Sequence, residues 1–333
     1  MPENRQIRLA RRPQGEVVAE DWEHVSEPLP EPGEGELTAR TLAVSLDPAM
    51  RGWLDDRPSY LPPVGLGDVM RANTVIEVTE SRHPDFAPGE HLVGAFGVQT
   101  HVLSDGRGAR RVDLSQAPPA TYLGALGTTG LTAYFGLFEV GALRDGETVV
   151  VSGAAGAVGS VAGQIAKLKG CRVVGIAGGP EKCALLTDEL GFDAAIDYRS
   201  EDVARALRRH CPDGIDVYFD NVGGEILDAA LVNLAMHARV VLCGAISQYQ
   251  SGRPRGPANY MMLLVRRSRM QGFLVFDYVD RYAEALAELS TWVADGRLKV
   301  KEHVVRGSID DFPDTLQMLF RGENVGKLVL ELT

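Results

Sequence analysis

The stretch that decides the fold reads VVVSGAAGAVGS, residues 149–160. A run of three valines stops at a glycine-rich turn, and apolar residues follow at helical spacing at Val158, Val161, Ile165 and Leu168. This order predicts a strand, a tight turn and a helix. Glycines in such a turn let the backbone approach a pyrophosphate, and the N-terminus of the following helix presents unpaired N–H groups to it. The stretch therefore predicts a dinucleotide-binding unit.

The next expected strand, residues 171–177, bears on which dinucleotide is bound. An NAD site usually carries Asp or Glu at the end of this strand, where it binds the ribose 2′-hydroxyl. Here the strand ends at Gly178 and Gly179, and Lys182 follows in the first turn of the next helix. An ammonium group there pairs with a 2′-phosphate, which favours NADP(H) over NAD(H). Two alternatives stay open: Lys182 is a solvated surface lysine, or Glu181 replaces the NAD-binding acid.

Length and composition set the broad class. The 333 residues are enough for two domains, and 45% hydrophobic with 24% charged residues is ordinary for a soluble globular protein. The net charge is −11 and no long basic run occurs, so no nucleic-acid partner is expected. No apolar stretch is long enough to span a bilayer, and the N-terminus lacks an apolar signal core. We therefore expect a cytoplasmic protein without a membrane partner.

The cysteines and histidines predict no metal site. The chain has four cysteines, none in a C-x-x-C pair, and seven scattered histidines without the spacing of zinc ligands. Cys171 and Cys243 fall in strand-like runs, which favours buried, reduced thiols.

The patterns divide the chain into a β-rich first part and an α/β second part. Up to about residue 120, alternating runs such as 37–44 and 70–78 are separated by turn signals. From about 122 to 295, strands alternate with helices at spacings that suit βαβ crossovers, which predicts a doubly wound parallel sheet. The strand candidates are residues 148–152, 171–177, 194–197, 215–219, 239–243 and 270–275. The tail shows strands at 303–306 and 327–332 around a helix at 309–320.

Five further motifs carry a resemblance to a known family. They are DPAMRG at 47–52, GTTGLTAY at 127–134, YFDNVGG at 218–224, GAISQY at 244–249 and ENVGK at 323–327. With the glycine turn, they make the chain resemble the zinc-independent medium-chain dehydrogenase/reductases, and within these the NADPH-dependent alkenal/one reductases. The resemblance implies an α/β Rossmann domain at 126–298. It also implies a GroES-like β-rich catalytic domain, formed by 1–125 with 299–333.

The resemblance also implies roles for individual residues. The glycine turn would hold the pyrophosphate, Lys182 the 2′-phosphate, and Tyr198 would lie near the same phosphate or its ribose. Asn221 would touch the cofactor, Asn324 would reach the nicotinamide from the tail, and Thr128 and Thr129 would lie near the nicotinamide. The pyrophosphate residues are Ala154, Gly156, Ala157, Val158 and Gly159.

Most of these residues have a purely structural alternative. Asn221 is equally suited to a turn after a strand, Asn324 to a helix C-cap before Gly326, and Tyr198 to an exposed loop. Met50 and Arg51 either line the substrate pocket or only support their loop. Several relatives carry tyrosine where this chain has Ala49, so a different pocket wall is expected, with Tyr60 partly filling the gap.

The implied reaction is NADPH-dependent reduction of the conjugated C=C bond of α,β-unsaturated ketones and aldehydes. Hydride goes to the β-carbon and a proton to the α-carbon, while charge develops on the carbonyl oxygen. The Tyr249 hydroxyl is the candidate donor to that oxygen and part of the substrate pocket. A cofactor ribose hydroxyl is the competing donor, and in the bland alternative Tyr249 only packs against the cleft wall. Alternative functions are an NADPH:quinone oxidoreductase and a non-catalytic NADPH-binding sensor.

Two further expectations concern assembly and mobility. Residues 270–276 form an apolar, β-rich run late in the sheet, and an uncovered edge of this kind predicts an edge-to-edge homodimer. Residues 248–257 are rich in Gly, Pro and Arg. They predict either a mobile lid over the site or a plain surface loop.

Overall fold

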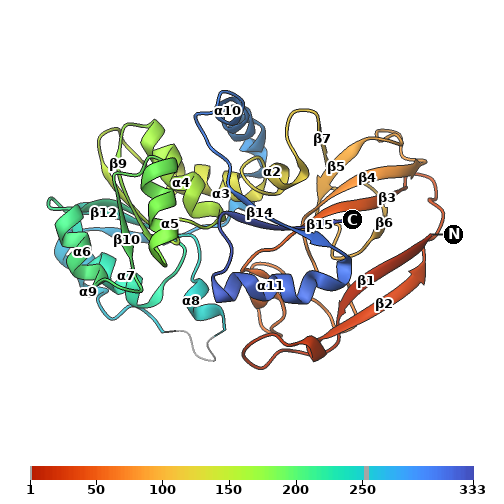
Figure 1. Ribbon diagram of the computed structural model, residues 1–333, viewed down its shortest axis with the longest axis horizontal. Helices are drawn as coiled ribbons and strands as arrows, with labels where there is room; N and C mark the ends of the chain where they lie inside the picture. Colours follow the sequence, from red (N-terminus) through yellow and green to blue (C-terminus); the bar gives the residue numbers. More distant parts are fainter. Residues whose placement is uncertain (1, 251–254) are drawn as a thin grey trace. The chain divides into compact units, whose positions relative to one another are not determined.

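The computed structural model describes residues 2–250 and 255–333. The chain divides into two compact units, which we call the β unit (Met1–Leu123 with Glu302–Thr333) and the α/β unit (Gly124–Lys301). Each is described by itself (Figure 1). Across the described ranges, every helix is too short or too polar to cross a membrane.

The β unit contains a large mixed sheet and a separate strand pair. The large sheet has the order β14-β15-β3-β4-β5-β7, with β6 paired to β3. β14 and β15 are parallel, whereas β15 is antiparallel to β3, so the C-terminal strands extend a sheet begun by the N-terminal part. The strands are β1 Glu3–Leu9, β2 Trp22–Pro28, β3 Leu37–Ser45, β4 Thr74–Ser81, β5 His91–Gly94, β6 His101–Ser104, β7 Arg110–Val112, β14 Glu302–Gly307 and β15 Lys327–Leu332.

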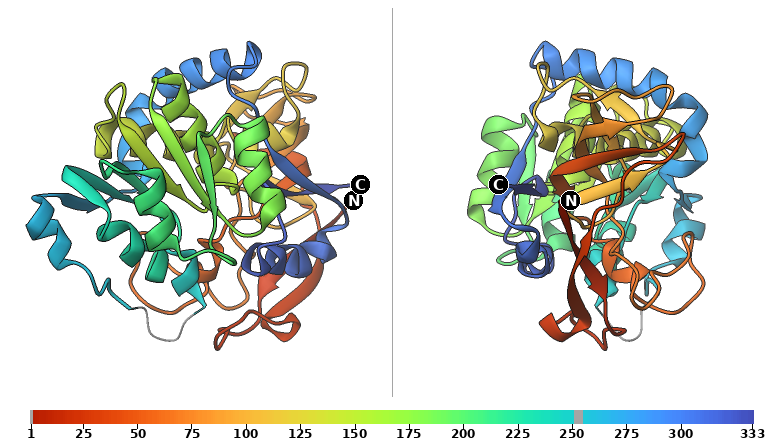
Figure 2. Two further views of the ribbon diagram at one scale, coloured as in Figure 1. Left: turned by 60° about the vertical axis from the view of Figure 1, so that its left-hand side comes forward. Right: turned by 90° about the vertical axis from the view of Figure 1, so that its right-hand side faces the viewer.

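A hydrophobic core joins the two ends of the chain within this unit. Helix α11 (Phe312–Arg321) packs against the β1–β2 pair, as Figure 2 shows, and the Trp22 and Phe312 rings meet edge to face at 5.6 Å. The residues that alternate inward along β1, such as Ile7 and Leu9, have no exposed surface. The other helical segments of this unit are η1 Ala19–Asp21, α1 Met50–Trp53, α2 Pro119–Leu123 and η5 Ile309–Asp311.

The α/β unit is built on a six-stranded sheet of order β10-β9-β8-β11-β12-β13, in which every pair is parallel. The predicted doubly wound parallel sheet is therefore confirmed. The strands are β8 Thr148–Ser152, β9 Arg172–Ala177, β10 Ala194–Asp197, β11 Ile215–Asp220, β12 Leu234–Leu242 and β13 Arg269–Gly272.

Helices cover both faces of this sheet. α6 (Val203–His210) and α7 (Gly224–Leu231) share one hydrophobic cluster with the sheet, and α3 (Thr128–Phe135) packs against α4 (Ala157–Leu168). The remaining helical segments are η2 Gly136–Val140, α5 Pro180–Ala184, η3 Leu185–Glu189, α8 Ile246–Tyr249, α9 Met261–Arg266, η4 Val275–Arg281 and α10 Tyr282–Ala294.

The strand order identifies a topological switch point between β8 and β11. From β8 the chain builds outward through β9 and β10, and it then returns to the other side of β8 for β11 to β13. In open α/β sheets, ligands bind beyond the carboxyl ends of the strands at such a point. The β8 glycine turn and the 218–224 motif meet there.

Two local predictions are wrong. The strand expected at 270–275 ends at Gly272, and η4 begins at Val275. Between them, the Phe273 ring lies so close to Gly136 that a Cβ there would come within 2.8 Å of it. Residues 248–257 were expected to lack helix, but Gln248 and Tyr249 belong to α8. Residues 251–254 of that expected lid lie outside the described residues.

Candidate active site

The glycine turn forms as predicted between β8 and α4. The Ala154 N–H donates to Ile176 O at 3.0 Å, which fixes the turn against the neighbouring strand β9. α4 begins at Ala157, so the first N–H groups of this 12-residue helix point toward the turn without partners inside the helix. A Cβ on Gly159 would lie 2.3 Å from Gly153 O, so only glycine lets the helix pack this closely on the turn. The expected pyrophosphate residues, 154 and 156–159, therefore lie together.

A buried carboxylate stands next to this turn, at the end of β11. Asp220 is 1% exposed, and its Oδ1 accepts hydrogen bonds from the Ser152 hydroxyl at 2.8 Å and the Tyr218 hydroxyl at 3.0 Å. Two backbone N–H groups, of Val222 and Gly223, also donate to Oδ1, at 3.1 and 3.0 Å. Burial raises the pKa of Asp220, while these donors act to lower it.

Asn221 is tied to the same place. Its backbone N–H donates to the Ser152 hydroxyl at 2.9 Å, and its Nδ2 donates to Ser152 O at 2.8 Å. The second bond orients the amide, so that the side-chain oxygen Oδ1 is turned away from Ser152. The Asn221 side chain is therefore fixed in the turn at the switch point, as its structural alternative requires, and its predicted contact with the cofactor stays a prediction.

The β9–β10 corner has a different character. The Asp197 carboxylate, at the end of β10, accepts from the N–H groups of Gly179 at 2.8 Å and Arg199 at 3.0 Å, and from the Ser200 hydroxyl at 2.8 Å. Chiefly the Gly179 bond lowers the pKa of Asp197. Both carboxylate oxygens are thus used to shape the corner.

Cations gather at this corner. Lys182 is half-buried on α5, and its pKa is lowered by burial and by the neighbouring Arg199 charge. The exposed Arg199 guanidinium has no hydrogen bond or ion pair to any residue that the structure describes, and it lies 6.0 Å from the Tyr198 ring centroid. A Cβ on Gly178 would lie 2.8 Å from Tyr198 and 2.9 Å from Arg199 Nε, so this glycine makes room for both side chains.

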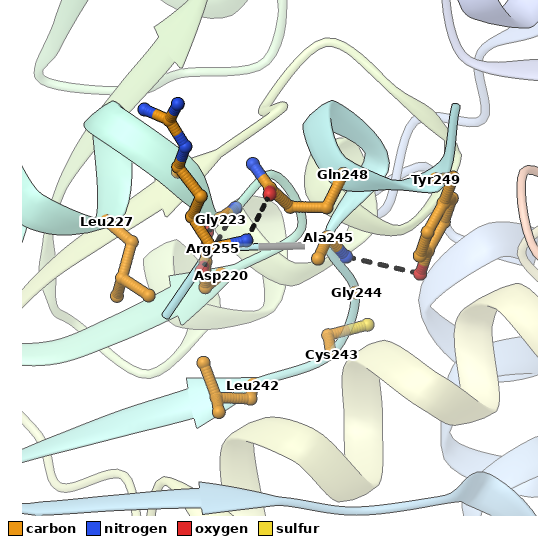
Figure 3. A pocket seen from close by; sticks show the side chains of 11 residues that line it. Asp220, Gly223, Leu227, Leu242, Cys243, Gly244, Ala245, Gln248, Tyr249 and Arg255 are labelled. Carbon is orange, nitrogen blue, oxygen red and sulfur yellow. Dashed lines mark hydrogen bonds between the residues drawn. The ribbon is translucent and has the colours of Figure 1, made fainter. Parts of the chain in front are cut away.

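Tyr249 lines a pocket at the carboxyl ends of β11 and β12 (Figure 3). Its hydroxyl oxygen accepts a hydrogen bond from the Ala245 N–H at 3.1 Å, which closes the α8 segment on itself. The pocket volume is about 280 Å³. Its lining residues are Asp220, Gly223, Gly224, Leu227, Leu242, Cys243, Gly244, Ala245, Gln248, Tyr249 and Arg255.

The pocket holds a thiol that is unsuited to nucleophilic chemistry. Burial raises the pKa of Cys243 to about 12, so the group stays protonated at neutral pH. The thiol is therefore a poor nucleophile at neutral pH, and the predicted role of the Tyr249 phenol stays a prediction.

The two threonines expected near the nicotinamide begin α3. Thr128 is half-buried and Thr129 is buried, and the Thr132 hydroxyl donates to Thr128 O at 2.7 Å. α3 packs against α4, the helix that follows the glycine turn. Their predicted contact with the nicotinamide stays a prediction.

The remaining expected residues belong to the β unit. Met50 has no exposed surface and lies in the core, which favours its structural alternative. Arg51 is 4% exposed, and it pairs with Asp55 at 2.7 Å and donates to Gly15 O at 3.0 Å. Tyr60, by contrast, is 45% exposed, and its hydroxyl accepts from Trp53 Nε1 at 3.2 Å.

Asn324 lies in the loop before β15, where its Nδ2 donates to Gly326 O at 2.9 Å. The alternative that it caps a helix is wrong, because α11 ends at Arg321 and is capped by Gly322 in the left-handed conformation. Its predicted approach to the nicotinamide stays a prediction.

The structure adds residues that the sequence analysis missed. Lys327 is 2% exposed, and its ammonium pairs with the half-buried Asp47 at 2.6 Å, so this ion pair joins the DPAMRG and ENVGK motifs. Arg199 and Asp220 were missed as well. Asp220 and Lys327 lie inside quoted motifs and Arg199 directly follows Tyr198, but only the structure shows what surrounds each of them. Over the described ranges, no group of three or more His, Cys, Asp or Glu side chains is placed to hold a metal ion.

Comparison with known proteins agrees with this architecture. A family model for the N-terminal domain of oxidoreductases matches residues 5–112, and one described as zinc-binding dehydrogenase matches residues 157–291. The crystal structure of CurA from Vibrio vulnificus in complex with NADPH is similar, with a TM-score of 0.93, 43% identity and 99% of both chains covered.

Relatives of known sequence are similar over almost the whole chain. The putative NADP-dependent oxidoreductase YfmJ of Bacillus subtilis is 46% identical, over 98% of this chain and 97% of the relative. The NADPH-dependent curcumin reductase of Escherichia coli is 42% identical, over 99% and 97%. The NADP(+)-dependent 2-alkenal reductase of Nicotiana tabacum is 40% identical, over 90% and 88%.

The fold and the matched models define a medium-chain dehydrogenase/reductase. Within that class, the chain belongs to the family of NADP-dependent oxidoreductases that includes these curcumin and alkenal reductases. The family and the fold class predicted from the sequence are confirmed.

Proposed function

We propose that this protein is an NADPH-dependent reductase of the conjugated C=C bond of enones and enals. The observation that carries the proposal is that the Tyr249 phenol lines a pocket at the same sheet edge as the glycine turn. The predicted reaction and cofactor are those named for the curcumin reductase and 2-alkenal reductase relatives.

The cofactor fits residues of the α/β unit. The glycine turn and the first turn of α4 would hold the pyrophosphate, because their N–H groups and missing Cβ atoms leave room for it. Lys182, Arg199 and Tyr198 would bind the 2′-phosphate, since two cations meet at a corner whose acid, Asp197, is bonded to the backbone. Asn221 Oδ1 would accept a hydroxyl of the cofactor. Bound NADPH supplies the hydride for the β-carbon of the substrate.

The protein's part in the chemistry is carried by Tyr249. Its hydroxyl would donate a hydrogen bond to the carbonyl oxygen of the substrate, where negative charge develops in the transition state. The bond from Ala245 N–H uses a lone pair of the Tyr249 oxygen and so fixes the hydroxyl in position. A proton then reaches the α-carbon from Tyr249 or from water.

A panel of acceptors tests the proposal. NADPH oxidation is followed with an enone, an enal, a quinone and no acceptor, and the same panel is repeated with NADH. We expect turnover with the enone or enal and a preference for NADPH of at least about tenfold in kcat/KM. Turnover with the quinone alone would assign a quinone reductase. Cofactor binding without turnover of any acceptor would assign a sensor.

We propose that the reaction proceeds without a metal ion. The described residues offer no ligand cluster, and the predicted β-rich domain contains no cysteine. Chelator-treated protein should stay fully active with well under one equivalent of zinc. Loss of activity on chelation would contradict this.

We also propose a homodimer. β13 is an edge strand, and exposed apolar side chains occur on the neighbouring segments α9 and η4: Met261, Leu264, Val265, Phe276 and Val279. A second copy would cover them. Sedimentation at micromolar concentration tests this, and a monomeric mass would contradict it. For the compartment we propose the cytoplasm, because all four cysteines are free thiols.

A further inference from the structure

The Asp220 carboxylate is unusual for a buried charge, because it is stabilised by hydrogen-bond donors and not by a cation. Four donors converge on Oδ1, and the Gly223 N–H is shared with Oδ2 at 3.2 Å. A buried carboxylate is costly unless it is bonded in this way.

Its contacts reach the glycine turn through Ser152. This serine is the last residue of β8, is fully buried, and precedes the turn directly. Its hydroxyl donates to Asp220 and accepts from Asn221 N–H, so one side chain links the ends of β8 and β11. The bonds of Asn221 to Ser152 make this link tight.

Its contacts also reach the Tyr249 segment. The Val222 and Gly223 N–H groups that bind the carboxylate fix the turn after β11, and the carbonyls of this turn accept bonds from the next segment. Cys243 N–H donates to Asp220 O at 2.9 Å, and the Ser247 N–H donates to Val222 O at 3.2 Å. The segment that leads to Tyr249 is therefore hydrogen-bonded to the turn after β11, and Asp220 fixes the conformation of that turn.

We propose that Asp220 is a positioning residue that holds the glycine turn, Asn221 and the Tyr249 segment in one arrangement for the dinucleotide. The Asp220 carboxylate accepts hydrogen bonds from Ser152, Tyr218, Val222 and Gly223, which all lie outside the 2′-phosphate corner. It therefore sets the affinity for the cofactor without setting the choice between NADPH and NADH. This inference rests on the proposed function only in that the cofactor is a nicotinamide dinucleotide.

The test measures dissociation constants of NADPH and NADH by fluorescence for Asp220→Asn and Ser152→Ala. Asp220→Asn removes the charge, and Ser152→Ala removes the hydroxyl that donates to it, so each variant loses the charge-assisted hydrogen bond between β8 and β11. The free energy of one such bond corresponds to roughly a 10–100-fold change in a dissociation constant. We expect Asp220→Asn to weaken both cofactors by the same factor within this range. Ser152→Ala should weaken both less, and in neither variant should the NADPH/NADH ratio move by more than about twofold.

Two control variants separate positioning from plain stability. Tyr218→Phe removes a donor to the same oxygen from within the core, so it should lower the melting temperature and leave both affinities near wild type. Asp216→Asn removes a second carboxylate that links β11 to β8, since Asp216 accepts a hydrogen bond from Thr148 N–H at 2.9 Å. This link lies at the amino ends of the two strands, away from the glycine turn. Asp216→Asn too should leave both affinities near wild type.

The inference is overturned if affinity follows the melting temperature across all four variants, or if Ser152→Ala binds both cofactors as wild type does. A change of the NADPH/NADH ratio in Asp220→Asn would overturn it too. Should Asp220→Asn fail to fold, Ser152→Ala decides. Enone turnover is not part of the measurement, so failure of the proposed reaction leaves these affinities readable. Failure of the wild type to bind either cofactor would refute both.

Discussion

Two regions of the α/β unit, both at the carboxyl edge of its sheet, use carboxylates in opposite surroundings. At the β8–β11 end, Asp220 is buried, and Ser152 and Asn221 complete a dense network around it. At the β9–β10 corner, Asp197 shapes an open turn beside two cations, Lys182 and Arg199. The first region holds backbone in place and the second presents charge. We propose that the first region recognises the shape of the dinucleotide and the second its charge, from different strands of one sheet.

Because of this separation, substitutions in the two regions should have different effects on cofactor binding. A change at the buried end should act on every dinucleotide and on the chemistry, whereas a change at the charged corner should act on the 2′-phosphate alone. The predictions below run from the largest expected effect to the smallest.

Tyr249→Phe tests whether the buried end contributes chemistry as well as shape. If the hydroxyl stabilises the enolate, kcat for enone reduction should fall by roughly 10–1000-fold while NADPH affinity is kept. A deuterated-cofactor isotope effect shows whether hydride transfer limits the rate. Tyr260→Phe, on an exposed tyrosine of the same unit, is the matched control and should behave as wild type. More than about half of the wild-type kcat, with hydride transfer rate-limiting, would remove Tyr249 from the mechanism.

Gly159→Ala tests the close packing of α4 on its turn. The new Cβ would lie 2.3 Å from Gly153 O and 2.8 Å from Ala154 Cα, so backbone must move. We expect about a 100-fold loss of kcat/KM with NADPH and NADH alike, the scale of an ångström-sized misplacement. Gly272→Ala is the control, because its Cβ would meet nothing within 4 Å. A loss confined to NADPH would contradict the division of roles.

The sequence predicted the regular parts of this region well, for a physical reason. β8, the turn and α4 follow from local signals: β-branched residues, glycines and a helical period within 20 consecutive positions. β10 was likewise predicted with its observed bounds, 194–197. Local pattern was enough wherever neighbours in sequence are also neighbours in space.

The missed residues depend on contacts between distant segments. Asp220 and Ser152 are 68 positions apart, and Lys327 and Asp47 are 280 apart. Nothing in the local sequence around Asp220 distinguishes a buried acceptor of four donors from an ordinary turn aspartate. β13 was also predicted too long, and the Phe273 ring just beyond its end lies close to Gly136, which is far away in the sequence.

Lys182→Ala and Arg199→Ala test the charged corner. Each should raise KM for NADPH, by about tenfold for Lys182, and leave KM for NADH nearly unchanged, because only the 2′-phosphate contact is lost. Arg199→Lys should recover part of the loss, since it restores the charge without the planar fork. Arg205→Ala, on the neighbouring α6, is the control for a general loss of positive charge. Equal losses with both cofactors at Lys182 would refute its assignment.

The smallest expected effect is a dependence of NADPH affinity on alkaline pH. Burial and the Arg199 charge lower the pKa of Lys182 below that of an ordinary lysine, so its charge is lost at a lower pH than usual. The 2′-phosphate has a second pKa near 6 and is fully charged above about pH 8, so between about pH 8 and 10 its own charge does not vary. Only the protonated ammonium binds it strongly, so NADPH affinity should fall as pH rises through the lowered pKa of Lys182, and binding near that pH should take up a proton.

NADH affinity should stay flat over the same window, and Lys182→Ala should flatten the NADPH curve while Arg199→Ala should shift it upward in pH. The upward shift follows because removal of a neighbouring positive charge raises the pKa of Lys182. Titration of cofactor fluorescence at several pH values measures all four curves. If NADPH affinity still falls steeply with pH in Lys182→Ala, the titrating group is a residue other than Lys182. The preference of the charged corner for NADPH over NADH would then be assigned to Arg199 and Tyr198.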